Sequence, residues 1–296
     1  MSDAATGPEG RQPRSMIVTG AGTGIGAATA VRASRAGWHV TLAGRRLDRL
    51  RDVAERCGRD SGADSGSDAG AGAVAVAADV TDPDTVATLV TGVVERTGRL
   101  DCVVANAGVM TAGTVLDTDP ADWDRALATN LTGAFHLARA ALPYLLRTGG
   151  SLVAVSSIAA VRAPSAAAAY AVSKAGLVML AQSVARDFGG HGVRANVVCP
   201  GWVRTEMADE EMAEFGTPYG LDRDQAYEEV TRLVPQGRPA EADEVAAALL
   251  WLAGAEASYV NGAVLVVDGG TILVDPGTVA LDFEVRPREQ RSAPSD

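Results

Sequence analysis

Three residues in the second half of the chain have the types and spacing of a proton-transfer site: Ser157, Tyr170 and Lys174. Tyr170 and Lys174 are four residues apart in the Ala-rich stretch 167–188, which we expect to be helical, so both side chains would share one face. An ammonium group beside a phenol favours the phenolate, so Lys174 should lower the pKa of Tyr170 from its usual value of about 10. Such a tyrosine could protonate a carbonyl oxygen or accept a proton from an alcohol.

Ser157 follows the apolar run 151–156, which has the pattern of a buried strand. Its hydroxyl would therefore lie at the carboxyl end of a strand, the edge where open α/β sheets bind their ligands. Taken alone, the motif is common by chance. The same residues could be a half-buried tyrosine, a solvated lysine and a turn serine, so the rest of the sequence has to decide.

A second candidate site begins near the amino terminus, where residues 16–26 pass from an apolar strand into a glycine-rich turn and then into a helical pattern. The glycines are spaced as Gly20-x-x-x-Gly24-x-Gly26. Glycine lets the backbone approach a pyrophosphate closely, and the helix that follows offers free N–H groups and the positive end of its dipole. An ordinary tight turn between a strand and a helix is the alternative, but the strand and helix on either side are the context that a nucleotide site requires.

Taken together, the motifs identify a family. The sequence resembles a single-domain short-chain dehydrogenase/reductase over about residues 15–270, and the order and spacing of the motifs carry the resemblance. The resemblance implies a Rossmann-like, doubly wound parallel α/β sheet of about seven strands with helices on both faces, in a single domain. The matching residues are Thr19, Gly20, Gly24, Ile25, Gly26, Asp79, Val80, Asn106, Ala107, Gly108, Asn130, Ser157, Tyr170, Lys174, Pro200, Gly201, Val203 and Thr205.

The resemblance also implies a role for each catalytic position. Tyr170 would be the general acid/base, and Lys174 would hold the nicotinamide ribose while lowering the tyrosine pKa. Ser157 would hydrogen-bond the substrate oxygen. Asn130 would hold a water molecule in a proton relay behind Lys174.

The remaining matches imply a nicotinamide-dinucleotide site. Asp79 and Val80 would contact the adenine, and the segment 106–108 would pass beside the cofactor ribose. Val203 and Thr205 would contact the nicotinamide carboxamide. The other residues assigned to the cofactor are those of the glycine turn and of the turn after the sixth strand: Gly20, Thr23, Gly24, Ile25, Gly26, Pro200 and Gly201.

The end of the second strand bears on which nicotinamide cofactor is used. An acidic residue there would accept hydrogen bonds from a ribose 2′-hydroxyl, whereas arginine would pair with a 2′-phosphate. Gly44 replaces the expected acid, and Arg45 and Arg46 follow it, which favours NADP(H). Two solvated arginines at the start of a helix are the alternative. Thr23 stands where NADP-preferring members often have another basic residue, so use of NAD(H) stays open.

Strand and helix patterns alternate along the chain, which predicts a parallel sheet covered on both faces. We expect strands at 16–19, 38–43, 73–77, 101–105, 151–156, 194–199 and 263–267. The expected organisation is a disordered tail over 1–14, a Rossmann-fold dehydrogenase domain over 15–271 and an extension over 272–296. Within the domain, 58–72 would be a flexible insertion, and 205–235 would be a substrate lid or a pair of surface helices packing a local apolar cluster.

Composition limits the function classes. The net charge of −11 argues against a nucleic-acid surface, and the three cysteines and three histidines are too scattered to suggest a disulfide framework or a metal site. We identify no apolar run of membrane-spanning length and no signal peptide, so a cytoplasmic location with no membrane partner is expected. In similar proteins the helix at 241–253, the strand at 263–267 and the helices carrying Asn130 and Tyr170 form subunit interfaces. A homotetramer or homodimer is therefore expected, although the same apolar faces could be internal core.

The function expected from these features is hydride transfer between NADP(H) and a ketone or secondary alcohol. Reduction of a 3-oxoacyl thioester on an acyl carrier protein is the first alternative, although the acidic sequence shows no basic patch for such a partner. A sugar epimerase or dehydratase would have a different glycine spacing. A nucleotide-sensing protein without turnover is the second alternative, and loss of Ser157, Tyr170 or Lys174 would be its usual mark.

Overall fold

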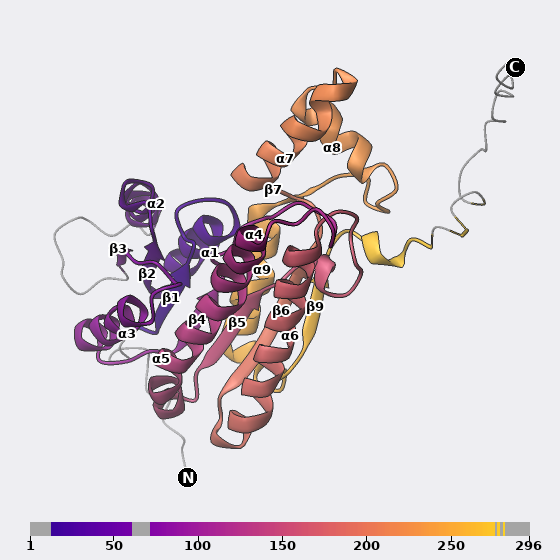
Figure 1. The fold of residues 1–296 in the computed structure, drawn as a ribbon. Helices are drawn as coiled ribbons and strands as arrows, with labels where there is room; N and C mark the ends of the chain where they lie inside the picture. The colour runs from indigo at the N-terminus through magenta and orange to yellow at the C-terminus, as the bar shows by residue number, and fades with distance from the viewer. Residues whose placement is uncertain (1–12, 61–71, 276, 279–280, 282–296) are drawn as a thin grey trace, which may run out of the picture.

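A seven-stranded parallel sheet forms the centre of the molecule, in the order β3-β2-β1-β4-β5-β6-β9 (Figure 1). The computed structural model describes residues 13–60, 72–275, 277–278 and 281. Each predicted strand is present, with ends within one residue of those expected, and the predicted fold class is confirmed. The strands are β1 (Ser15–Thr19), β2 (His39–Gly44), β3 (Ala73–Ala77), β4 (Cys102–Ala105), β5 (Ser151–Val155), β6 (Arg194–Pro200) and β9 (Val264–Val267).

Helices cover both faces of the sheet because successive strand residues point to opposite sides. In β1, Ile17 packs into one core cluster while Met16 and Val18 pack into the other. The first cluster includes α3 (Pro83–Thr97), α5 (Gly133–Thr148) and α6 (Ala168–Phe188), and the second includes α1 (Gly24–Arg35), α2 (Leu47–Asp60) and α9 (Ala242–Ala253). Fully buried runs of Val, Ile, Leu and Ala in the central strands follow from this double coverage.

The strand order changes direction between β1 and β4, which are neighbours in the sheet although β2 and β3 lie between them in sequence. Because all seven strands are parallel, the loops that follow them meet at one edge. In sheets of this kind the crevice outside the carboxyl ends, at the point where the order changes, is where ligands bind. This edge is therefore where the predicted site residues should meet.

Two helices, α7 (Glu206–Gly216) and α8 (Arg223–Thr231), stand clear of these layers (Figure 1). The short strands β7 (Val203–Arg204) and β8 (Ala240–Glu241) pair at the base of this segment. A small cluster of Ala208, Met212 and Tyr227 holds the two helices together. The segment predicted as a lid, 205–235, is thus a helical pair with a local apolar cluster of its own.

Several predicted boundaries fall at the limits of the described chain. Helix α2 continues through Asp60, so an insertion does not begin at residue 58 as predicted. The rest of the 58–72 segment, up to residue 71, most of the 1–14 tail and most of the 272–296 extension lie outside the described residues.

One described helix, spanning 168–191, is long and apolar enough to cross a membrane by length and composition alone. The expectation that no apolar run reaches that length is therefore wrong. This stretch contains α6, which packs Leu177, Ala181 and Val184 into the core against the sheet. Since 39% of the apolar window is buried inside the protein, packing against the sheet accounts for part of its apolar composition.

Candidate active site

Ser157, Tyr170 and Lys174 meet at the carboxyl edge of the sheet. Tyr170 and Lys174 lie on one face of α6, with Lys174 Nζ 5.6 Å from the centre of the Tyr170 ring. Lys174 is only 5% exposed, and its Nζ donates to the backbone oxygen of Val155 at 2.9 Å. Ser157 comes two residues after Val155, and its hydroxyl interacts with that of Tyr170. The structure thus places the three groups, which come from the end of β5 and from α6, where they can act on one substrate oxygen.

Burial controls the titration of this site. It raises the pKa of Tyr170, and a hydrogen bond with Ser157 and the charge of Glu211 in α7 modify that shift in opposite directions. The expectation that the pKa of Tyr170 lies below its usual value is therefore wrong for this structure, because desolvation of the phenolate outweighs the hydrogen bond with Ser157. Burial also lowers the pKa of Lys174 to about 8. A neutral Tyr170 is accordingly the form that this site favours near pH 7.

Lys174 is the only lysine in the sequence; every other basic residue among the 26 lysines and arginines is an arginine. An ammonium is a compact point charge whose pKa shifts readily on burial, whereas a guanidinium stays charged and needs room for its planar fork. The single lysine therefore occupies a buried position that suits a compact, titratable cation better than a guanidinium.

Asn130 lies in a π-helical stretch, 127–132, between α4 (Pro120–Ala126) and α5. Its Oδ1 accepts from Val109 N at 2.7 Å, and its Nδ2 donates to Val109 O at 3.0 Å and to Ser173 Oγ at 2.9 Å. Ser173 Oγ in turn donates to the backbone oxygen of Tyr170 at 2.7 Å. Asn130 therefore ties the loop after β4 to the first turn of α6, and its role in a water relay stays a prediction.

The glycine-rich turn forms a close-fitting cradle at the start of α1. Gly20 and Gly24 have φ of +65° and +53°, and a Cβ on Gly26 would lie 2.3 Å from the Gly20 oxygen. Thr23 caps the helix without a side-chain bond, and the first helical hydrogen bond runs from Ala27 N to Thr23 O. The amides before Ala27 therefore precede the helical ladder and are available to an anion. This donor set fits a pyrophosphate at Gly20, Thr23, Gly24, Ile25 and Gly26.

The loop after β4 holds this cradle from behind. The Asn106 side chain donates to the backbone oxygens of Thr19 and Gly20, at 2.9 and 3.2 Å. Thr19 Oγ1 accepts from the amides of Asn106 and Ala107, at 3.0 and 3.1 Å. Gly108 lies against the catalytic groups, since a Cβ there would be 3.4 Å from Lys174 Nζ. The predicted ribose segment thus connects the phosphate turn with the catalytic residues.

The loops after β2 and β3 carry the residues predicted to bind the adenosine part of the cofactor. Arg45 and Arg46 are exposed directly after Gly44. Hydrogen bonds from Thr81 lower the pKa of Asp79, and the charge of Arg45 acts in the same direction. Val80 is buried beside α5, where a Cβ on Gly133 would meet it at 2.6 Å.

The turn after β6 brings Pro200, Gly201, Val203 and Thr205 to the same edge. A Cβ on Gly24 would lie 3.0 Å from Thr205 Cγ2, so this turn contacts the glycine cradle directly. Thr205 Oγ1 also accepts from Ala208 N at 3.2 Å and caps α7. The start of the helical pair is therefore fixed against the phosphate turn.

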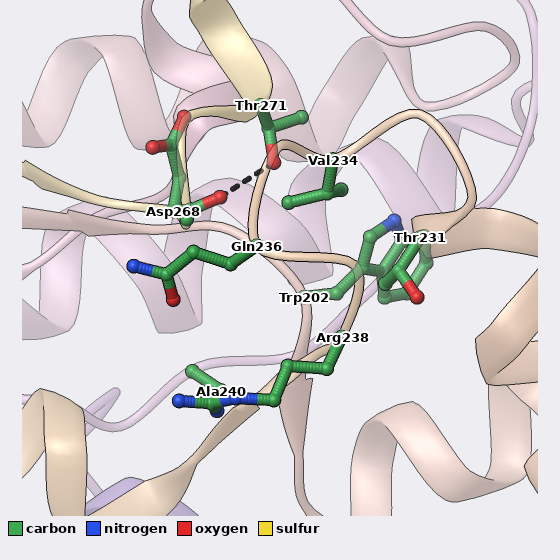
Figure 2. Close-up of a pocket in the computed structure, with 9 residues that line it drawn as sticks. Trp202, Thr231, Val234, Gln236, Arg238, Ala240, Asp268 and Thr271 are labelled. Carbon is green, nitrogen blue, oxygen red and sulfur yellow. Dashed lines mark hydrogen bonds between the residues drawn. The ribbon is translucent and has the colours of Figure 1, made fainter.

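Neither of two cavities in the described chain is lined by Ser157, Tyr170 or Lys174. Figure 2 shows the smaller, between Trp202 and the turn where Thr271 Oγ1 donates to Asp268 O at 2.6 Å. Its volume of about 20 Å³ holds one water molecule, not an organic substrate. The larger, about 740 Å³, is lined by Arg14, Arg194 and others at the amino ends of the strands, opposite the catalytic edge. In the described part of the chain, no group of three or more His, Cys, Asp or Glu side chains could hold a metal ion, and Cys57, Cys102 and Cys199 are all buried.

Some residues of the site were not singled out from the sequence. Ser156 Oγ donates to the backbone oxygen of Lys174 at 2.8 Å, and Ser173 links Asn130 to α6. Arg49 and Glu206 form an ion pair between α2 and α7 at 3.3 Å. The only sequence signal for the two serines is that they are adjacent to the motif residues Ser157 and Lys174. No local sequence pattern indicates the pair of Arg49 and Glu206, which are 157 positions apart.

Comparisons with known proteins point in one direction. A family model described as Enoyl-(Acyl carrier protein) reductase matches residues 20–271. A meso-2,3-butanediol dehydrogenase of Serratia marcescens is 36% identical over 252 residues, which cover 85% of this chain and 92% of the relative. The crystal structure of levodione reductase superposes with a TM-score of 0.82 at 30% identity, covering 90% of this chain and all of the other. An actinorhodin polyketide ketoreductase solved with NADPH gives a TM-score of 0.80 at 31% identity, covering 87% of this chain and 97% of the other.

Proposed function

The chain belongs to the short-chain dehydrogenase/reductase family, and from that premise we propose that it transfers hydride reversibly between NADP(H) and a secondary alcohol or its ketone. It is an oxidoreductase that acts on CH–OH groups, as its relatives are. The observation that carries the proposal is the meeting of Ser157, Tyr170 and Lys174 at the ligand edge of the sheet, beside the glycine cradle.

In the reductive direction, Tyr170 would donate its proton to the substrate oxygen while the Ser157 hydroxyl hydrogen-bonds the same oxygen. Burial raises the pKa of Tyr170, which keeps the phenol protonated at neutral pH and ready to donate. Lys174, close to the tyrosine ring, would stabilise negative charge as it develops on the phenol oxygen. Asn130 would hold the loop after β4 and the start of α6 in a fixed relative position for this transfer.

The nicotinamide cofactor, when bound, supplies or accepts the hydride. Its pyrophosphate would be held by the turn from Gly20 to Gly26, whose helix start offers amide donors. The loops carrying Asp79, Val80 and residues 106–108 would bind the adenine and ribose. The turn with Pro200, Gly201, Val203 and Thr205 would bind the nicotinamide, and Lys174 and Tyr170 its ribose.

Use of NADP(H) in preference to NAD(H) rests on Arg45 and Arg46. Both arginines follow Gly44 and are exposed at the carboxyl end of β2, where a 2′-phosphate would be recognised. The ketoreductase neighbour solved with NADPH supports the same choice. A preference is a difference between two affinities, so both cofactors belong in the test.

The surrounding organisation completes the proposal. The domain over 15–271 carries the whole site, and the helical pair in 205–235 would close over the substrate. We further propose a homotetramer or homodimer in the cytoplasm, with small carbonyl and alcohol molecules as substrates and no nucleic-acid or membrane partner. The net charge of −11 fits a protein without a nucleic-acid surface.

The test is the consumption of NADPH and NADH with a panel of small ketones, quinones, sugar ketones, polycyclic ketones and acyl thioesters. We expect Tyr170→Phe to lower kcat by a factor on the order of 10²–10⁴, since it removes the proton donor. Tyr259→Phe is the matched control, because Tyr259 is fully exposed and should leave kcat unchanged. A Tyr170→Phe variant as active as the wild type would refute the proposed mechanism.

Reduction of 3-oxoacyl thioesters on a carrier protein is the second candidate, supported by 32% identity over 250 residues to a 3-oxoacyl-[acyl-carrier-protein] reductase of Thermotoga maritima. It predicts higher rates with carrier-bound 3-oxoacyl thioesters than with free ones, and equal rates would count against it. A sensing role without turnover is the remaining alternative. Cofactor binding with no consumption across the whole panel would support that alternative.

A further inference from the structure

Glu206, the first residue of α7, pairs with Arg46, which directly precedes α2, and with Arg49 of α2. Its Oε2 is 3.1 Å from Arg46 Nη2, and its Oε1 is 3.3 Å from Arg49 Nη2. One carboxylate therefore uses both of its oxygens on two guanidinium groups. All three side chains are partly exposed, so a solute can reach them.

These pairs lie beside the phosphate cradle. The Arg49 Cβ would be 3.2 Å from a Cβ on Gly22, within the glycine-rich turn. Thr205, which precedes Glu206, contacts Gly24 of the same turn. Arg46 directly follows Arg45 at the carboxyl end of β2. Glu206 is thus placed where the phosphate turn, the end of β2 and the start of α7 come together.

A carboxylate and a phosphate compete for the same guanidinium donors, since both anions accept the paired N–H groups of arginine. Exposed ion pairs contribute little free energy, so a phosphate with about two negative charges can displace such a carboxylate. We propose that Glu206 is a specificity-determining residue that competes with the 2′-phosphate of NADP(H) for Arg46 and Arg49, and that Arg49 is part of the 2′-phosphate site. The inference rests on the proposed use of NADP(H).

NAD(H) has no 2′-phosphate and would leave both ion pairs in place. Glu206 therefore weakens the binding of NADP(H) but not that of NAD(H). It reduces the preference for NADP(H) over NAD(H) that the arginines create. Because Glu206 begins α7, the same exchange would release the first turn of that helix from α2 whenever the phosphorylated cofactor is bound.

The test measures the dissociation constants of NADPH and NADH by isothermal titration calorimetry at low salt, with no substrate. Glu206→Gln should bind NADPH roughly two- to fivefold more tightly, because it removes a competitor of the strength of an exposed ion pair. Its affinity for NADH should not change. Glu210→Gln is the matched control, since Glu210 is exposed on the same helix and makes no ion pair with any residue of the described chain.

A second background separates competition from net charge. In an Arg46→Ala/Arg49→Ala protein, NADPH should bind more weakly, and adding Glu206→Gln should then have no further effect. Equal tightening by Glu206→Gln and Glu210→Gln, or weaker NADPH binding in Glu206→Gln, would overturn the inference alone. If the double arginine variant binds NADPH as the wild type does, Arg46 and Arg49 do not hold the 2′-phosphate, and this inference fails. Equal affinities of the wild type for NADPH and NADH would instead count against the proposed NADP(H) preference itself.

Discussion

At the residue scale, the choice of lysine over arginine at position 174 determines which cation is buried beside Tyr170. The chain uses arginine for every other basic position and keeps lysine for the buried position beside Tyr170. An arginine at this position would stay charged, and its planar guanidinium would need more room than the compact ammonium of lysine. Burial holds the pKa of Lys174 near 8, so the protein keeps a cation where solvation is poor. Such a residue should make the fold less stable than it could be.

We therefore expect Lys174→Met to stabilise the free protein at pH 7 while abolishing turnover. Lowering the pKa of a buried lysine from 10.5 to about 8 corresponds to a destabilisation of about 3 kcal/mol below pH 8. Loss of the hydrogen bond to the Val155 oxygen offsets about 1 kcal/mol of the gain. The free energy of unfolding of both proteins can be measured in urea.

The advantage of the variant should depend on pH in one direction. Above pH 8 the folded wild type loses the proton of Lys174 while the unfolded chain still holds it, so wild-type stability rises with pH up to about 10.5. The stability difference should therefore shrink by about 2 kcal/mol between pH 7 and pH 9.5. Tyr170→Phe is the control and should follow the wild-type pH dependence in this window. A Lys174→Met variant that is less stable than the wild type at every pH would contradict the argument.

At the scale of the element, close backbone contacts determine where the glycine-rich turn requires glycine. Gly20 and Gly24 adopt left-handed φ values, but the tightest contact belongs to Gly26, where an added Cβ would lie 2.3 Å from the Gly20 oxygen and 2.6 Å from Asn106 Nδ2. Both neighbours are fixed, one as backbone and one through its hydrogen bonds to Thr19 and Gly20. Neither atom can move without opening the turn.

Gly26→Ala should therefore destabilise the protein by about 2–4 kcal/mol, the range of an overpacked core position with a broken hydrogen bond, and should abolish cofactor binding. Thermal unfolding and NADPH titration measure the two effects. Gly92→Ala in α3 is the matched control, because nothing lies within 4 Å of its Cβ. That change should stabilise the helix by up to about 1 kcal/mol. Normal NADPH affinity in Gly26→Ala would show that the turn is not the cradle.

How far the sequence predicts this structure depends on the range of each interaction. Strand ends were predicted to within one residue, because alternating burial and the breaks after each strand are local patterns. Tyr170 and Lys174 were placed correctly on one helix face for the same reason. The pKa direction of Tyr170 was not, since it depends on how completely the surrounding fold excludes water. The ion pairs of Glu206 join distant segments, and no single-sequence pattern reports them.

At the scale of the whole molecule, one property of the fold gathers the site. Parallel strands send their loops to one edge, so residues between Gly20 and Thr205 converge although they are spread over most of the chain. The opposite edge holds the larger recess lined by Arg14 and Arg194 and carries none of the predicted site residues. The fold therefore explains why the sequence motifs mark the candidate active site and the larger cavity does not.

The outer face of the layer formed by α5 and α6 carries large apolar side chains that the single chain leaves exposed. Phe135 on α5 and Val172 and Met179 on α6 are among them, and Met179 is 62% exposed. Figure 1 shows the two helices side by side on one side of the sheet. Exposed apolar groups gathered on one layer are typical of a subunit interface. We therefore assign the proposed homo-oligomer contact to this face.

Met179→Asp should dissociate that oligomer into smaller species, because two symmetry-related copies would each place a carboxylate in an apolar contact. Light scattering coupled to gel filtration, over a range of protein concentrations, measures the mass. Leu116→Asp is the matched control: Leu116 is 93% exposed but lies outside α5 and α6, and its variant should keep the wild-type mass. A monomeric wild type, or an oligomer of unchanged mass in Met179→Asp, would show that this layer is not the interface. An oligomer lost in both variants would mean that added charge, not the α5–α6 face, controls association.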